Sequence, residues 1–402
     1  MSHYTPDAAN NRAIKLLTFF MFLIFAMTTD AVGVIIPEVI KRYDLTLTQA
    51  ATFHYGTMIA IAVSGICLGF LADRLGRKPS ILIGLALFAL ACFLFMVGNS
   101  FAYFLSLLLV TGVAIGIFKT AALALVGDIS SSNREHTSTM NLVEGFFGVG
   151  AIIGPTLVTY LLSRGVDWTY VYLVAGICAV LLIVLASRTR YPEHIKPQEP
   201  VRWTAAFGMM RDPFALFFSG GIALYVVVEA AIYVWMPTLL LDYDGHWTSV
   251  ATYALSIFFI FRAAGRFLGA WILLHLDWKL AMVLFTGGIF VCYLLSVWLG
   301  VDVALWLLPL SGLFMSIVYP TLNSKGISCF PVSEHGAVAG LILFFTAVAA
   351  ALGPLLMGLL GDAFGHVRFG FLFCLLCAAL LWFGAVYNWL KDPARQRLNA
   401  DY

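Results

Sequence analysis

Twelve apolar segments, each long enough to cross a lipid bilayer, constrain the fold of this chain more than any other feature. A bilayer core roughly 30 Å thick is spanned by about 20 apolar residues in helical form. Because backbone groups in lipid must bond within the protein, and the segments are too long for barrel strands, we expect helices. The sequence therefore predicts an all-α membrane protein with spans at about 16–36, 50–72, 80–98, 101–126, 139–162, 168–187, 214–238, 247–271, 280–299, 303–327, 337–360 and 368–390.

Composition agrees with an integral membrane protein and excludes several other classes. Hydrophobic residues make up 61% of the chain and charged residues 11%, against about 25% charged residues in soluble domains. The net charge of +2 gives no indication of a nucleic-acid partner. No motif for a zinc protease, a serine hydrolase or a phosphate-binding loop occurs, so we expect neither an enzyme nor a nucleotide-driven pump.

The second half of the chain partly repeats the first at an offset of 199 to 200 residues. The repeated positions are Gly65 and Gly265, Gly69 and Gly269, Gly112 and Gly312, Gly154 and Gly353, and the acidic residues Asp30 and Glu229. A shared offset in segments of matching rank is typical of a duplicated helical bundle with a site between its halves. We expect a first bundle at 1–187, a cytoplasmic linker at 188–213 and a second bundle at 214–402.

Basic residues orient the predicted helices. Fifteen lysines and arginines near the span ends fall on the side of the termini, and four fall on the other side: Lys41, Arg42, Arg164 and Arg368. The excess of cations marks the cytoplasmic side. The sequence therefore predicts that both termini are cytoplasmic.

The segment from Gly69 to Lys78 carries a family signature. It reads Gly-Phe-Leu-Ala-Asp-Arg-Leu-Gly-Arg-Lys and matches the pattern G-x-x-x-D-R-x-G-R-[RK] between the second and third spans. With six-plus-six spans and a basic central linker, the chain resembles the major facilitator superfamily over its whole length. The resemblance implies two pseudo-symmetric six-helix bundles that alternate around a midplane site. It also implies a gating role for Asp73, Arg74, Arg77 and Lys78.

Within that superfamily the chain resembles the fucose permease-like sugar:proton symporters. The matching residues are Asp30 with Ile35-Ile36-Pro37, the stretch from Asn141 to Pro155, Tyr225 to Glu229 with Trp235-Met236-Pro237, and Gly265-Arg266. The chain departs from these relatives in the fourth span, where Lys119 replaces an acidic residue.

Three carboxylates are candidates for proton coupling, because an ionisable group inside a span is costly unless it is paired or faces water. Asp30 lies in the first span, Glu229 in the seventh, and Glu144 near the cytoplasmic start of the fifth. Asp30 could load and unload a proton, serve as a structural partner of Lys119, or do both. Glu144 could face the cavity or act at its mouth.

The candidate substrate-binding residues are polar, aromatic or cationic. Tyr225 and Tyr233 lie four residues on either side of Glu229, so we expect one helix face that combines a carboxylate with rings for a sugar. Lys119 could pair with Asp30, contact an anionic substrate, or extend to the membrane interface. Arg266 is a further gate candidate, and the remaining substrate candidates are Asn141, Arg262, Tyr319 and Asn323.

Gly150 and Gly154, which precede Pro155, partly match a proton-antiporter motif whose final glycines are missing here. Small residues four apart also allow close helix packing, which is the meaning we predict.

Together these observations predict a monomeric secondary transporter in a bacterial cytoplasmic membrane, moving a sugar or sugar derivative with protons. Its partners would be the solute, protons and lipid, with the proton gradient in place of any cofactor and no metal. Three alternatives stay open: a proton-driven exporter of drugs or metabolites, an organic-anion carrier that uses Lys119 and Arg262, and a membrane sensor that binds solute without flux.

Overall fold

The structure is a computed structural model of the chain, and it describes residues 8–68, 75–130, 133–192, 208–241, 243–331 and 334–398. Every regular element in these ranges is a helix. Eleven helical segments of the described residues are long and apolar enough to cross a membrane. The helix at the place of the second expected span, α3 (Leu47–Leu68), is not among these eleven. The prediction of an all-α membrane protein is confirmed.

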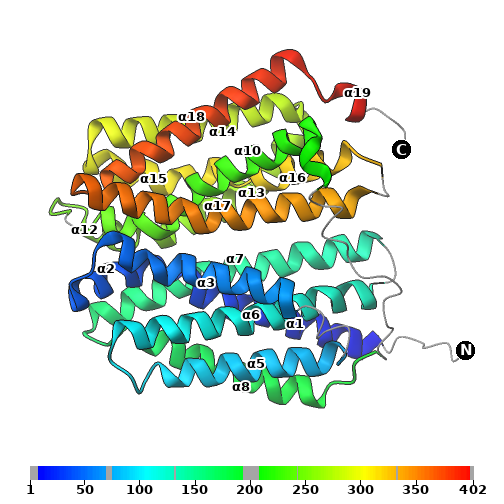
Figure 1. Ribbon diagram of the computed structural model, residues 1–402, viewed down its shortest axis with the longest axis vertical. Helices are drawn as coiled ribbons and strands as arrows, with labels where there is room; N and C mark the ends of the chain where they lie inside the picture. Colours follow the sequence, from blue (N-terminus) through cyan, green and yellow to red (C-terminus); the bar gives the residue numbers. More distant parts are fainter. Residues whose placement is uncertain are drawn as a thin grey trace, which may run out of the picture. The chain divides into compact units, whose positions relative to one another are not determined.

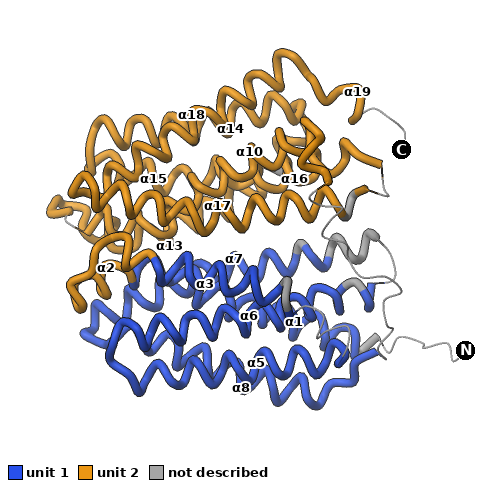
Figure 2. Tube along the Cα trace, viewed as in Figure 1, with its two compact units in different colours: residues 1–35, 52–199 blue, residues 36–51, 200–402 orange. Residues whose placement is uncertain are grey.

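The chain forms two compact units, shown in Figure 2. The first comprises residues 1–35 and 52–199. Within it α1 packs against α7 and α8, and α5 packs against α6 and α8 (Figure 1). The bounds of these helices are α1 Ala8–Thr29, α5 Arg77–Leu94, α6 Phe101–Ile129, α7 Asn133–Ser163 and α8 Tyr170–Arg188.

The second unit comprises residues 36–51 and 200–402 and repeats the same pairings. Here α10 packs against α17 and α18, and α14 packs against α15 and α18. These pairs hold the same rank in the second unit as α1 with α7 and α8, and α5 with α6 and α8, in the first. The bounds are α10 Pro213–Ala230, α13 Ala254–His275, α14 Trp278–Leu299, α15 Val301–Met315, α16 Val318–Ser328, α17 His335–Phe364 and α18 Arg368–Lys391.

The repeated glycines lie at equivalent helix contacts in the two units. A Cβ at Gly112 of α6 would lie 2.8 Å from Ala60 Cβ of α3, and a Cβ at Gly312 of α15 would lie 2.8 Å from the Phe258 ring of α13. A Cβ at Gly154 of α7 would clash with the Met27 carbonyl of α1. The duplication seen in the sequence is therefore a duplication of close helix packing. Gly154 has the packing role that the sequence predicted.

Among the described residues, the first, seventh and tenth spans are interrupted within their length, and the short helix α12 (Thr248–Thr252) is separated from α13 by Tyr253 at the start of the eighth. The first is split at residues 30–31 into α1 and α2 (Val32–Tyr43). The seventh continues from α10 through a π-helical turn, η2 (Ala231–Trp235), into α11 (Met236–Leu239), and the tenth is split at residues 316–317 into α15 and α16. Pro237 and Pro320 explain the last two interruptions, because a proline supplies no N–H and its ring clashes with the carbonyl four residues earlier. Such irregular turns in spans often accompany functional sites.

The segment 36–51, which includes most of α2 and the first residues of α3, belongs to the second unit. Asp362 near the end of α17 accepts hydrogen bonds from the backbone N–H groups of Leu47 at 2.7 Å and Thr48 at 2.9 Å. These N–H groups have no acceptor within their own helix, so the carboxylate caps α3. The division at 1–187, 188–213 and 214–402 stays a prediction.

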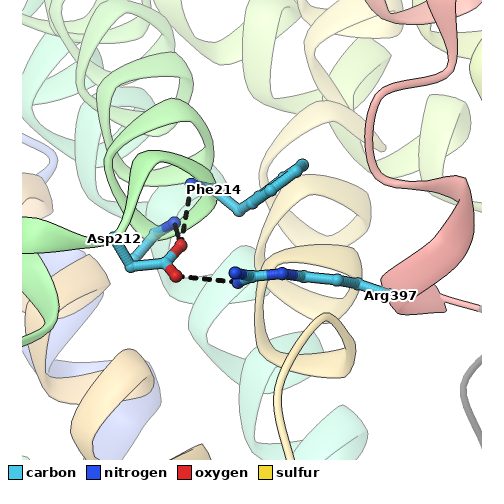
Figure 3. Close-up of polar contacts among 4 residues, drawn as sticks. Asp212, Phe214 and Arg397 are labelled. Carbon is cyan, nitrogen blue, oxygen red and sulfur yellow. Dashed lines mark hydrogen bonds and ion pairs between the residues drawn. The ribbon is translucent and has the colours of Figure 1, made fainter.

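The start of α10 is held by a second carboxylate. The Asp212 side chain accepts hydrogen bonds from the backbone N–H groups of Phe214 at 2.8 Å and Ala215 at 3.2 Å (Figure 3). Arg397, in the short helix α19 (Arg395–Leu398), donates to the other carboxylate oxygen at 2.8 Å. The end of the chain is thereby attached to the beginning of the seventh span.

Candidate functional site

A largely buried charge pair joins α10 to α13 in the second unit. Arg262 Nη2 of α13 lies 2.5 Å from Glu229 Oε1 of α10, and the two side chains are 19% and 10% exposed. The hydroxyl of Tyr225 donates to the same Oε1 at 2.8 Å. Arg262 and Tyr225 thus share one carboxylate oxygen of Glu229. The other oxygen, Oε2, is the atom of this cluster on which a proton or a solute hydroxyl could be held.

Local sequence explains how the cluster is assembled. Tyr225 and Glu229 are four residues apart, so α10 presents both on one face. On α13, a Cβ at Gly265 would lie 2.7 Å from Ser316 Oγ, so this helix approaches the interruption between α15 and α16 closely. Arg262 lies one turn before this glycine. Close packing at Gly265 thus fixes the position along the helix axis at which the Arg262 guanidinium contacts the Glu229 carboxylate.

Four further predicted residues lie on the interrupted spans or on α13, and two of them, Tyr319 and Arg266, lie near Tyr225. The ring of Tyr319, on α16, lies with its centroid 6.3 Å from that of Tyr225. Arg266 lies within electrostatic range of the Tyr225 hydroxyl. Tyr233 is half-buried in the π-helical turn, and Asn323 is half-buried one turn after Tyr319. The structure therefore brings Tyr225, Glu229, Arg262 and Tyr319 together, as the sequence pattern suggested for the first two.

The first unit contains a different arrangement around Lys119 of α6. Its ammonium group lies over two rings of α1, 4.9 Å from the centroid of Phe25 and 5.9 Å from that of Phe22. Its electrostatic partners are Glu144 of α7 and Asp30, with Glu144 contributing more. Among the described residues no ion pair within 4.0 Å joins Lys119 to Asp30. The cation is held by aromatic faces and by two carboxylates at longer range.

The acidic residues of this unit occupy different environments. Asp30 is half-buried at the interruption of the first span, and its Oδ2 accepts a hydrogen bond from the Thr29 hydroxyl at 3.3 Å. Glu144 is exposed on α7. Asn141 lies one turn before it on the same helix, but its side chain is outside the described residues.

The predicted gating residues are only partly described. Asp73 and Arg74 lie outside the described residues. Arg77 Nε donates to Asp128 Oδ2 near the end of α6 at 2.8 Å. Lys78 donates to the carbonyls of Ser187 and Thr189 at 2.7 Å each, where a cation stabilises the end of α8. These contacts join three helices of the first unit at one end.

Sequence reasoning missed several partners in these clusters. Asp128 was not predicted, although an acidic residue at the end of a span beside a basic loop is a usable signal. The main-chain carbonyl of Met315 accepts from the Tyr225 hydroxyl at 3.0 Å, and no side-chain pattern could have indicated it. In the described part of the chain, no group of three or more histidine, cysteine or acidic side chains is arranged to hold a metal ion.

Comparisons with known proteins give the family context. The family model described as "Major Facilitator Superfamily" matches residues 18–354. A "Glucose/galactose transporter" of Brucella abortus is 24% identical over 383 residues, which cover 91% of each chain.

Among solved structures, the nucleoside transporter NupG superposes with a TM-score of 0.77 at 14% identity, covering 94% of this chain and 99% of that one. The E. coli fucose:proton symporter FucP superposes with a TM-score of 0.64 at 20% identity, covering 94% and 98%. These likenesses establish the fold.

Proposed function

This chain belongs to the Major Facilitator Superfamily and is a membrane transporter, not an enzyme; we propose that it takes up a sugar or sugar derivative by proton-coupled alternating access. The observation that carries the proposal is the buried cluster of Tyr225, Glu229 and Arg262. Sugar transport is supported by the relatives named for glucose, galactose and fucose, and proton coupling by the fucose:proton symporter.

Glu229 is the proposed proton-binding and substrate-linked carboxylate of the second unit. Its Oε1 is held by Arg262 and Tyr225, which leaves Oε2 for a proton or a sugar hydroxyl. Binding at this oxygen would alter the charge balance around Arg262. Such a change of pairing inside a low-dielectric bundle is a means of biasing one conformation over another.

Asp30 and Glu144 are the proposed proton-coupling residues of the first unit, and Lys119 is the cation that interacts electrostatically with both. Asn141, Tyr233, Tyr319 and Asn323 remain proposed solute contacts. The residues Asp73, Arg74, Arg77, Lys78 and Arg266 remain proposed gating residues. We also place the protein, as a monomer, in a bacterial inner membrane with both termini in the cytoplasm.

Transport in proteoliposomes tests the proton coupling. Asp30→Asn should abolish uphill accumulation of the solute while leaving counterflow exchange, because the variant still binds solute but cannot carry a proton. Glu229→Gln should lose accumulation too. Asp302→Asn serves as the matched control, since Asp302 is exposed in the first turn of α15. Retained accumulation together with lost counterflow in Asp30→Asn would refute the assignment of Asp30 as a proton-coupling residue.

An organic-anion carrier is the second candidate, and Lys119 favours it. Its ammonium group makes no close ion pair with a described carboxylate and could therefore receive an anionic solute. A thermal-shift screen separates the two candidates, because a ligand of the folded state raises the melting temperature by mass action. Stabilisation by neutral sugars that is lost in Glu229→Gln supports the symporter. Stabilisation only by carboxylates or phosphates, lost in Lys119→Ala or Arg262→Ala, supports the anion carrier.

A further inference from the structure

The hydroxyl of Tyr225 has one hydrogen atom and two acceptors. It lies 2.8 Å from Glu229 Oε1 and 3.0 Å from the carbonyl oxygen of Met315. The tyrosine side chain is 1% exposed, so water does not compete for the hydroxyl. Only one of the two acceptors can receive a strong, linear hydrogen bond at a time.

The second acceptor, the carbonyl oxygen of Met315, lies at the interruption of the tenth span. Met315 is the last residue of α15, and the helix resumes as α16 only at Val318. Pro320 removes the N–H that would bond the carbonyl of Ser316, which accounts for the interruption. The Tyr225 hydroxyl therefore reaches from α10 to the edge of an interrupted span, next to the closely packed α13.

We propose that Tyr225 is a positioning residue whose hydroxyl passes from Glu229 to the Met315 carbonyl when Glu229 is protonated, so that proton loading tightens the interruption between α15 and α16. This inference rests on the proposed function, in which Glu229 carries the proton. It gives Tyr225 a part in coupling through its hydroxyl, apart from any contact with the solute.

Hydrogen-bond strength determines the direction of the change. A carboxylate is a charge-assisted acceptor, with bonds roughly twice as strong as those to a neutral oxygen. While Glu229 is ionised, its Oε1 outcompetes the peptide carbonyl for the single hydrogen. Protonation at Oε2 removes the negative charge, so the peptide carbonyl becomes the better acceptor.

Other titratable groups around Glu229 are few and do not offer the same choice. Cys374 Sγ of α18 lies 4.0 Å from the Val227 carbonyl. Tyr293 of α14 donates to the Val228 carbonyl at 2.6 Å and lies within electrostatic range of Glu229. The charged and titratable side chains of the described residues that lie around the cluster or its neighbour Tyr293 are Arg262 and Arg266 of α13, Cys292 and Tyr293 of α14, Tyr319 of α16, and Cys374 and Cys377 of α18.

Hydrogen–deuterium exchange of the full-length protein in lipid nanodiscs tests whether the Tyr225 hydroxyl changes its acceptor. Glu229→Gln mimics the neutral carboxyl, so the peptide covering residues 313–324 should exchange about two- to tenfold more slowly, the effect of one net hydrogen bond. In a Tyr225→Phe background the same substitution should leave exchange of this peptide unchanged. Slowing of equal size in that background would overturn the proposal, as would no slowing in the parent protein.

Tyr293→Phe is the matched control. It also removes a fully buried hydroxyl that donates to a carbonyl of the second unit, but this carbonyl lies within α10 rather than at the interruption. Glu229→Gln should therefore slow exchange in the Tyr293→Phe background as it does in the parent protein. Loss of the effect in both backgrounds would show a general loosening of the unit and overturn a specific role of Tyr225.

A second measurement covers the case in which Tyr225→Phe does not fold. On acidification from about pH 8 to about pH 5, exchange of this peptide in the parent protein should slow beyond its intrinsic pH dependence, and in Glu229→Gln it should not. An equal pH dependence of amide exchange in the two proteins would overturn the proposal. Uptake assays distinguish failure of this inference from failure of the proposed function. If protonation of Glu229 slows amide exchange of this peptide but no proton-driven accumulation is measured, the proposed function alone is refuted.

Discussion

Removing the carboxylate at the start of α10 should destabilise the second unit in two distinct steps. Asp212 caps the helix through the N–H groups of Phe214 and Ala215, and it also pairs with Arg397 (Figure 3). The guanidinium of Arg397 lies 4.4 Å from the centroid of the Phe214 ring and 5.2 Å from that of Phe330. Asp212→Asn keeps a capping oxygen but loses the charge, whereas Asp212→Ala loses both.

The contacts set the size of each step. Asn caps a helix about as well as Asp, so Asp212→Asn should cost only the partly exposed ion pair, about 0.2–1 kcal/mol, and the charge at the helix N-terminus, about 0.3–1 kcal/mol. Asp212→Ala should cost about 1 kcal/mol more through loss of the cap. Arg397→Gln should cost about 1 kcal/mol, because the pair and the contacts with two rings are lost together.

The pH dependence follows from the position of the carboxyl. Burial raises the pKa of Asp212, but hydrogen bonds from Arg397 and from the backbone amides of Ala215 and Phe214 outweigh it, so the net pKa lies below the ordinary 3.8. A lowered pKa in the folded state means that the ionised carboxylate stabilises the protein above the ordinary pKa. This advantage over Asp212→Asn should disappear as the pH falls through the lowered pKa.

Thermal unfolding in detergent, followed for the three single variants and for the Asp212→Asn/Arg397→Gln double variant, measures these terms. The double variant should be less destabilised than the sum of the single ones by the energy of the pair. Arg395→Gln, on the same short helix but exposed, should leave the melting temperature unchanged. Strict additivity, or a melting temperature of Asp212→Ala equal to that of the parent protein, would refute the reasoning.

Three further substitutions have expected outcomes. Gly154→Ala should lower stability by about 1–3 kcal/mol in thermal unfolding, since its methyl group would meet a carbonyl of α1, whereas Gly148→Ala on the same helix meets open space and should be neutral or stabilising. Asp362→Ala should cost about 1 kcal/mol, because α3 loses its cap. Glu229→Ala, which unlike Gln leaves no acceptor oxygen, should destabilise strongly, up to about 3–5 kcal/mol, by leaving the Arg262 guanidinium without its partner, and Arg262→Met should restore part of the loss in the double variant.

Much of the architecture could be predicted from the sequence, because a membrane leaves the backbone few choices. Long apolar segments must become helices in lipid, and the repeat of Gly112 as Gly312 already indicated two related bundles. The structure shows that these glycines lie at equivalent contacts. The pairing of Tyr225 with Glu229 was also predictable, since residues four apart on a helix are neighbours.

Only the tertiary structure decided which charges meet. From the sequence, Asp30 and Lys119 were an expected pair and Arg262 was a cation without an assigned partner. In the structure Arg262 contacts Glu229, while Lys119 lies over the rings of Phe22 and Phe25. The sequence places each charge at a depth along its helix but leaves open the direction in which the helix faces. That rotation is set by close packing between helices, which depends on side-chain shape at many positions at once.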